Sequence, residues 1–325
     1  MQLNPTALPK RPGIARRLFR KLLGLLLGLF VVLNAVAAFH AWHFTHFAPS
    51  TANRTLPPDQ LSRLQRLKIL FTGISLPKPV AHSQPAVEYE DVQLEDGTPG
   101  WWLPVPNAKG TVLLAHGYGG EKASMLRRAL VFRKLGYQTL LIDFAGSGAS
   151  EGFATTIGFK EAAQITTAYH YIRQRSTGKL FLMGASMGAA AILKAVAEDS
   201  LQPTGILLEC PFSTLYRTVC QRFRIAGIPE VPLAGLLTFW GGALNGFNAF
   251  SYAPVDYARA VRCPVLLMHG AQDPLVSADE IQQLYEAIPG PKTVLTCPET
   301  GHFDFMETCA ERWETVVCTF VDSHF

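Results

Sequence analysis

Short apolar runs alternate with amphipathic stretches from Val87 to the end of the chain, and this alternation constrains the fold more than any other feature. Short continuous apolar runs are typical of strands that are buried on both faces. Strands that alternate with helices indicate a mostly parallel sheet with helices on both faces. We therefore expect an α/β fold with an eight-stranded sheet, its strands covering 87–94, 101–103, 111–115, 139–142, 180–183, 206–208, 265–268 and 293–295. The expected helices cover 122–135, 158–175, 187–198, 278–288 and 305–321.

Sites in parallel sheets form at the carboxyl ends of the strands. The strand expected at 180–183 is followed by the sequence GASMG at 184–188, and a helix follows at once. G-x-S-x-G between a strand and a helix has the context of a nucleophile elbow. Gly184 and Gly188 permit a tight turn and a close approach of strand and helix. The pattern predicts Ser186 as an exposed nucleophile at a helix N-terminus.

A second glycine-rich loop, HGYGG at 116–120, follows the strand expected at 111–115. Such a loop can direct a backbone N–H at an oxyanion. We assign this role to the amides of Tyr118 and Met187, with Gly117 as a supporting residue of the loop. His116 is interpreted as a residue that orders the loop rather than as a proton shuttle.

Two further loops carry an acid and a base. Asp273 follows the strand expected at 265–268, and His302 lies after the strand expected at 293–295. The chain order Ser186, Asp273, His302 is the nucleophile–acid–base order of a hydrolase triad in this architecture. Glu209 also follows a strand end, so it is the alternative acid.

These motifs together resemble the α/β-hydrolase superfamily, in its branch of bacterial serine aminopeptidases and lysophospholipase-like esterases. The matching segments are 116–120, 143–152, 184–188, 269–276 and 301–302, and the resemblance covers about 87–325. It implies acyl transfer to water through an acyl-enzyme on Ser186. In this superfamily an insert at 211–256 forms a cap over the site.

The predicted cap has many apolar side chains and few charges. This suits an apolar acyl pocket, although we favour packing of the cap on the domain as the main use of these side chains. Arg217, Arg222 and Arg224 could meet an anionic head group, and a solvated face is the favoured interpretation.

The N-terminal part carries six basic residues before residue 22, followed by an uncharged apolar run over 22–39. Eighteen helical residues span about 27 Å, close to the ~30 Å hydrocarbon core of a bilayer. We predict a cytoplasmic tail at 1–21 and an uncleaved signal-anchor at 22–39, with the catalytic domain outside the cytoplasm. Cleavage near Ala37 and secretion is the alternative.

Residues 40–86 contain several prolines and are predicted as a linker to the domain at 87–325. A helix expected at 59–71 has an apolar stripe with basic residues beside it. It could lie on an anionic membrane surface, but docking on the globular domain is favoured.

The positive charge of the chain is confined to its start. Of 29 Lys and Arg residues six precede residue 22, which leaves 23 against 25 Asp and Glu. The globular part therefore has no electrostatic basis for nucleic-acid binding. Phosphate-loop and dinucleotide motifs and clustered zinc ligands are also missing from the sequence, so neither a cofactor nor a metal is expected.

The favoured function is a serine hydrolase acting on a small ester or a lipid-like substrate. A peptidase, amidase or thioesterase on the same triad is the first alternative, because the triad does not choose the leaving group. A non-catalytic interaction protein with this fold is the second. The six cysteines leave disulfide pairing open, and the oligomeric state is not determined by the sequence.

Overall fold

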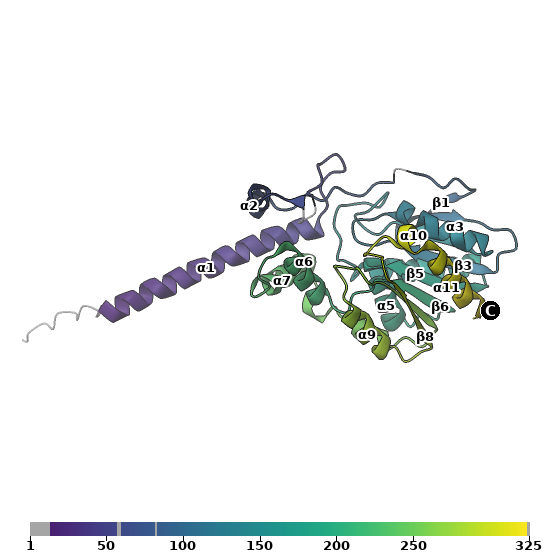
Figure 1. Ribbon diagram of the computed structural model, residues 1–325. Helices are drawn as coiled ribbons and strands as arrows, with labels where there is room; N and C mark the ends of the chain where they lie inside the picture. Colours follow the sequence, from purple (N-terminus) through teal and green to yellow (C-terminus); the bar gives the residue numbers. More distant parts are fainter. Residues whose placement is uncertain (1–13, 57–59, 82, 324–325) are drawn as a thin grey trace, which may run out of the picture.

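The computed structural model describes residues 14–56, 60–81 and 83–323 (Figure 1). One long helix extends from a body in which a twisted sheet is surrounded by helices. The sheet contains β1 (Glu90–Gln93), β2 (Pro99–Leu103), β3 (Gly110–Ala115), β4 (Gln138–Ile142), β5 (Lys179–Ala185), β6 (Gly205–Glu209), β7 (Val265–Gly270) and β8 (Lys292–Cys297). All eight predicted strands are present, so the predicted α/β fold is confirmed.

The strand order is β1-β2-β4-β3-β5-β6-β7-β8. β2 is antiparallel to β1 and β4, and the pairs from β4 through β8 are parallel. The carboxyl ends of β3, β5, β6, β7 and β8 therefore lie at one edge, which brings together the loops predicted to carry the site.

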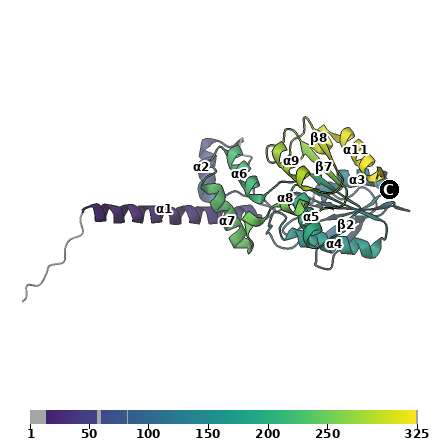
Figure 2. The same cartoon turned by 90° about the horizontal axis from the view of Figure 1, so that it is seen from below.

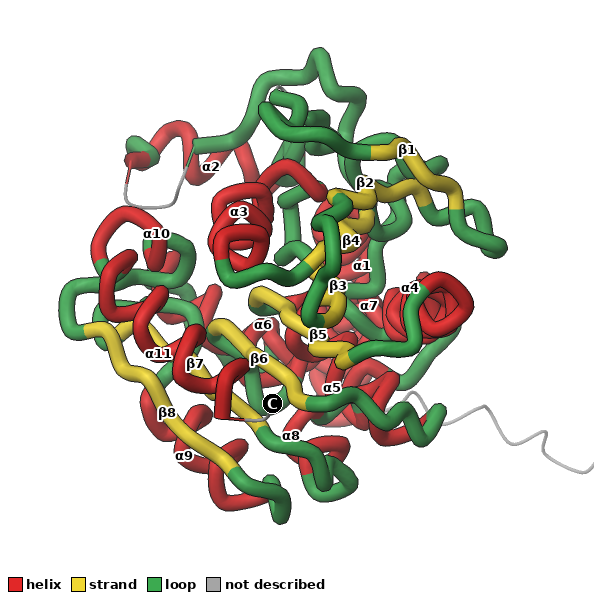
Figure 3. Tube along the Cα trace, turned by 90° about the vertical axis from the view of Figure 1, so that its right-hand side faces the viewer, coloured by secondary structure: helices red, strands yellow, loops and turns green. Residues whose placement is uncertain are grey.

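Helices cover both faces of the sheet (Figure 3). One face packs on α4 (Glu161–Arg175), α5 (Met187–Glu198), α8 (Pro254–Ala258) and α9 (Ala278–Ala287). The other packs on the 3-10 turn η2 (Lys122–Met125), α3 (Leu126–Lys134), α10 (Phe305–Thr308) and α11 (Ala310–Ser323). The helix predicted at 305–321 is thus divided at Cys309.

The long helix is α1 (Ile14–Thr45), which contains the predicted membrane segment and continues six residues beyond it. It is long and apolar enough to cross a membrane. Residues 15–32 are exposed, whereas Ala37 and Ala41 are buried against the body. Of the basic tail predicted at 1–21, residues 1–13 lie outside the described part of the chain.

The second helix, α2 (Arg63–Thr72), lies beside α1 in both Figure 1 and Figure 2. Ser62 caps it and shares a capping box with Gln65. None of its residues is buried, and Leu64 and Phe71 are 80% and 74% exposed. The favoured expectation that its apolar stripe docks on the globular domain is therefore wrong. Asp59, at the predicted start of this helix, lies outside the described residues.

The insert predicted as a cap comprises α6 (Leu215–Ala226), α7 (Leu233–Asn245) and the 3-10 turn η3 (Ala249–Ser251), between β6 and α8. Only part of its apolar surface packs on the domain. Phe212, Leu215 and Tyr252 are buried with Val276 and Ile281. The outer side chains remain exposed, and α7 packs along α1 instead.

Candidate active site

Ser186 occupies a strained turn between β5 and α5. Its backbone has φ 49° and ψ −106°. Such a conformation costs a residue with a side chain about 1–3 kcal/mol. A Cβ on Gly184 would collide with the backbone of Gly188, and a Cβ on Gly188 would collide with the Ala115 carbonyl. The Ser186 amide donates to the Glu209 carbonyl at 2.7 Å, and the turn needs both glycines to hold Ser186 at the strand end.

His302 joins Ser186 to Asp273. The Nε2 atom of His302 lies 2.9 Å from the Ser186 Oγ, and its Nδ1 lies 2.7 Å from the Asp273 Oδ2. The other oxygen of Asp273 accepts from the amides of Leu275 and Val276 at 2.7 and 3.0 Å. Burial alone would raise the pKa of Asp273, but the hydrogen bond and charge of His302 outweigh it and lower the pKa below its usual value. Asp273 is therefore ionised at neutral pH.

Glu209, the alternative acid, has other partners. It accepts from the Trp313 indole at 2.7 Å and pairs with Arg128, whose Nη2 lies 2.6 Å from its Oε2. Both side chains of this ion pair are almost fully buried. Burial alone would lower the pKa of Arg128, but the charge of Glu209 raises it. The net effect is a pKa above the ordinary value. Glu209 thus ties β6 to α3 and α11 instead of contacting His302.

The loop at 116–120 presents free amides to Ser186. In the described part of the chain, the N–H groups of Tyr118 and Met187 have no hydrogen-bond acceptor. A Cβ on Gly117 would lie 3.6 Å from the Ser186 Cβ, so the loop approaches the nucleophile closely. Unpaired amides beside a nucleophile can receive the negative charge that develops on an attacked carbonyl.

His116 and Asp143 hold this loop. The His116 Nε2 accepts from the Phe144 amide at 3.1 Å, and its Nδ1 lies 2.8 Å from the Gly117 carbonyl. Burial is the main cause that lowers the pKa of His116, so the ring is neutral. Asp143 accepts from the amides of Lys122 and Ala149. Neither side chain contacts Ser186, which leaves them an ordering role.

Cys210 is a residue at the site that the sequence interpretation missed. Its sulfur and ligand atoms of Asp273 and His302 lie within 4.8 Å of one another. That spacing also suits a metal ion, but both ring nitrogens of His302 are already engaged by Asp273 and Ser186. Burial raises the pKa of Cys210 well above its usual value, so it is a neutral thiol against the carboxylate. Cys210 directly follows β6, and this position at a strand end could have marked it as a site residue.

A disulfide joins Cys297, at the end of β8, to Cys309, between α10 and α11. The bridged segment contains His302. Closing a loop of this length removes unfolded-chain entropy worth about 3 kcal/mol. The bridge therefore restrains the loop that holds the histidine in place.

The C-terminal end of α1 also reaches the site, which the sequence interpretation did not foresee. The Tyr118 hydroxyl donates to the Phe44 carbonyl at 2.7 Å, and the Tyr118 and Phe47 rings lie 5.7 Å apart. The Thr155 amide donates to the Thr45 carbonyl at 2.9 Å. The predicted linker therefore begins in contact with the domain, and α1 is fixed to two of its loops.

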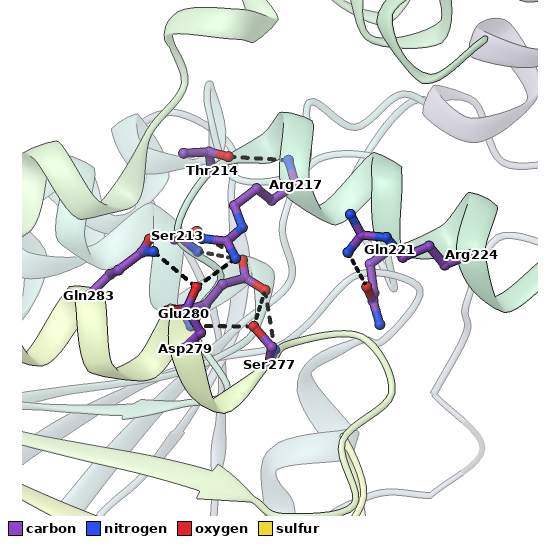
Figure 4. Close-up of polar contacts among 9 residues, drawn as sticks. All are labelled: Ser213, Thr214, Arg217, Gln221, Arg224, Ser277, Asp279, Glu280 and Gln283. Atoms are coloured by element: carbon purple, nitrogen blue, oxygen red, sulfur yellow. Dashed lines mark hydrogen bonds and ion pairs between the residues drawn. The ribbon is translucent and has the colours of Figure 1, made fainter. Parts of the chain in front are cut away.

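The three arginines of α6 have different surroundings. Arg217 binds Asp279 and Gln283 of α9, and Arg224 contacts Gln221 (Figure 4). Arg224 also pairs with Glu230. The pairing of Arg217 links α6 to α9. The pairing of Arg224 with Glu230 joins the last turn of α6 to the segment that follows it.

Arg222 is the exception among them. It is partly buried, has no acidic partner among the described residues, and lies 5.5 Å from the centre of the Tyr118 ring. Burial lowers the pKa of its guanidinium from the ordinary value. A Cβ on Gly119 would lie 3.5 Å from the guanidinium of Arg54. Two cations therefore lie beside the candidate oxyanion loop.

Comparison with known proteins agrees with the fold of the chain. A family model described as "Serine aminopeptidase, S33" matches residues 106–234, which include Ser186 but end before Asp273 and His302. The Pyrococcus furiosus esterase Pf2001 superposes with a TM-score of 0.63, is 23% identical, and the alignment covers 76% of this chain and 96% of that one. The chain has the α/β-hydrolase fold.

Two proteins similar to this chain in sequence differ in what their names state. The YqkD protein of Bacillus subtilis is 25% identical over 69% of this chain and 75% of its own length. The lysophosphatidylserine lipase ABHD12 of Danio rerio is 26% identical over 64% of this chain and 54% of its own length. This chain is similar to both proteins in sequence.

Proposed function

We propose that this α/β hydrolase is a membrane-anchored serine hydrolase that cleaves carboxylic esters of amphiphilic, lipid-like substrates. The observation that carries the proposal is the hydrogen-bonded chain Ser186–His302–Asp273 at a strained strand–helix turn. Ser186 attacks the carbonyl carbon, and His302 accepts its proton and later donates it to the leaving alkoxide. Asp273 holds the imidazole tautomer and stabilises the imidazolium.

The amides of Tyr118 and Met187 stabilise the tetrahedral oxyanion. Loss of one such donor typically costs about 2.7–4 kcal/mol of transition-state stabilisation. Water then attacks the acyl-enzyme, with His302 again as the base, and Ser186 is regenerated. Every step uses groups that this chain supplies.

The lipid-like substrate is supported by the surroundings of the site. The aromatic rings of Phe47 and Tyr118 lie together beside the candidate oxyanion loop, and Phe303, next to His302, is 56% exposed. The name of the ABHD12 relative states a lysophospholipid substrate. The anchor at 22–39 with an extracytoplasmic catalytic domain is part of the proposal, and the Cys297–Cys309 disulfide suits an oxidising compartment.

A series of p-nitrophenyl esters tests the substrate class. We expect kcat/KM to rise with acyl length by up to about fourfold per methylene, which corresponds to ~0.8 kcal/mol for each buried CH₂. Aminoacyl anilides measured beside the esters serve as the control for leaving group. Faster turnover of the anilides would favour the peptidase alternative. Failure of a fluorophosphonate to label the protein would favour the non-catalytic one.

The position of Arg222 beside the candidate oxyanion loop supports a substrate with an anionic group. We expect Arg222→Gln to lower the ratio of kcat/KM for lysophosphatidylserine to kcat/KM for a neutral monoacylglycerol by about tenfold or more, since a hydrogen bond to a charged group is worth ~1.5–3 kcal/mol. The matched control is Arg224→Gln on the same helix, because Arg224 already pairs with Glu230. An equal effect of both variants on the ratio would contradict the role of Arg222.

A further inference from the structure

We propose that the cap helix α7 lies within the membrane, in the leaflet nearest the hydrolase domain, with the lipid acyl chains against its exposed face. This inference rests on the proposed membrane anchoring of residues 22–39. It adds that the anchor and the cap enter the bilayer as one unit.

The helices α1 and α7 are in direct contact. α7 packs along α1, and the Trp240 indole donates to the Asn34 Oδ1 at 3.1 Å. Asn34 lies five residues inside the end of the predicted membrane span, a depth of about 7.5 Å along the helix. Trp240 must therefore be at the same depth. Asn34 also donates to the Phe30 carbonyl at 2.9 Å, so the one polar side chain of the span is satisfied within the protein, as an apolar environment requires.

The apolar part of α1 that precedes Asn34, the residue that contacts Trp240, is short and covers only residues 22–33. Twelve helical residues span about 18 Å. The hydrocarbon core is ~30 Å thick. If the body began at the membrane surface, the core would have to cover the basic residues Arg16, Arg17, Arg20 and Lys21 at the other end. Placing α7 in the bilayer removes this cost.

The segment that contains α7 is uncharged and apolar. Residues 231–255 contain no Asp, Glu, Lys or Arg. The side chains of Val231, Phe239 and Leu244 are 80%, 51% and 40% exposed. So much exposed apolar surface is unusual on a segment that faces water. Charges return at Glu230, which is paired with Arg224, and at Asp256. An uncharged, unpartnered face that continues a membrane-spanning helix fits a lipid environment.

The helix α2 marks the level of the head groups. The His40 Nε2 lies 3.1 Å from the Leu70 carbonyl, which fixes α2 beside the outer end of the span. Its exposed Leu64 and Phe71 face away from the protein core, and Arg63, Arg66 and Lys68 flank them. A basic amphipathic helix of this kind lies in the interface plane. In Figure 1, α2 lies on the opposite side of α1 from α6 and α7.

The test measures depth directly in the full-length protein. Phe239→Cys is labelled with the fluorophore NBD after Cys263 and Cys318, the partly exposed free cysteines, are replaced by serine. The protein is reconstituted in phosphatidylethanolamine–phosphatidylglycerol vesicles, with and without phospholipids brominated on the acyl chain. We expect a blue-shifted emission that the brominated lipids quench. Lys134→Cys, whose side chain is 73% exposed at the far end of α3, is the control and is expected to remain unquenched.

Emission at position 239 that matches the Lys134 control would overturn the proposal. A second copy of the chain would cover this face if the label at position 239 were unquenched and the unlabelled Phe239→Cys variant formed a disulfide-linked dimer. That result would also overturn the proposal. The measurement needs no activity. Repeating it on Ser186→Ala is expected to give the same quenching, so failure of the proposed function and failure of this inference are distinguishable.

Discussion

Replacing Ser186 with alanine is expected to lower kcat by roughly 10⁶-fold, because the nucleophile of a triad cannot be substituted by its neighbours. His302→Ala is expected to cost about as much, since the serine then lacks its base. The double variant is expected to lose little more than either single variant, because the residues act as a unit. Ester turnover by the purified full-length protein measures all three, and fluorophosphonate labelling gives an independent readout. Undiminished labelling of Ser186→Ala would place the nucleophile elsewhere.

A glycine at this position provides the matched control for folding. Ser186 has φ 49°. Glycine adopts positive φ without strain. Ser186→Gly is therefore expected to be as inactive as the alanine variant. Its free energy of unfolding is expected to exceed that of the native chain by about 1 kcal/mol. A variant that is inactive and more stable has lost chemistry rather than structure. If Ser186→Gly were instead strongly destabilised, the loss of activity could not be assigned to the hydroxyl.

The fold was predictable because its determinants are local. Each strand of the parallel sheet is a short apolar run that is buried on both faces, so the pattern of the chain alone marks it. The proximity of Ser186, Asp273 and His302 was predictable for a related reason: each residue follows a strand, and the carboxyl ends of parallel strands converge. Their order along the chain is the basis for the proposed roles of nucleophile, acid and base.

The contacts between distant segments were not predictable from such patterns. Nothing local to Tyr118 indicates that its hydroxyl binds the Phe44 carbonyl of α1. Docking of the α2 stripe on the domain is the expectation for a helix in water, whereas α2 has no buried residue in the structure. Cys210 and Arg222 were likewise overlooked as site residues, since their neighbours come from other parts of the chain.

Asp273→Asn is expected to lower kcat by about 10⁴-fold while leaving the fold intact. The two oxygens of Asp273 have different partners: Oδ1 accepts from the Leu275 and Val276 amides, and Oδ2 accepts from His302. The single carbonyl oxygen of an asparagine side chain must serve the two amides, which leaves its NH₂ group facing His302. The imidazole must then accept at Nδ1 and carry its proton on Nε2, so it can no longer take a proton from Ser186. The tautomer, rather than the loss of charge alone, explains the size of the effect.

The variant Glu209→Gln tests whether Glu209, rather than Asp273, is the acid that orients His302. Removing the charge of Glu209 leaves Arg128 buried without its partner. Breaking such a pair costs about 3–5 kcal/mol of stability. The kcat of the molecules that remain folded is expected to change little, because Glu209 does not contact His302. Thermal unfolding and kcat per active site, counted by fluorophosphonate titration, are measured on both variants. If Asp273→Asn kept its turnover while folded Glu209→Gln lost about 10⁴-fold, Glu209 would be the catalytic acid and the hydrogen bond between Asp273 and His302 would be structural.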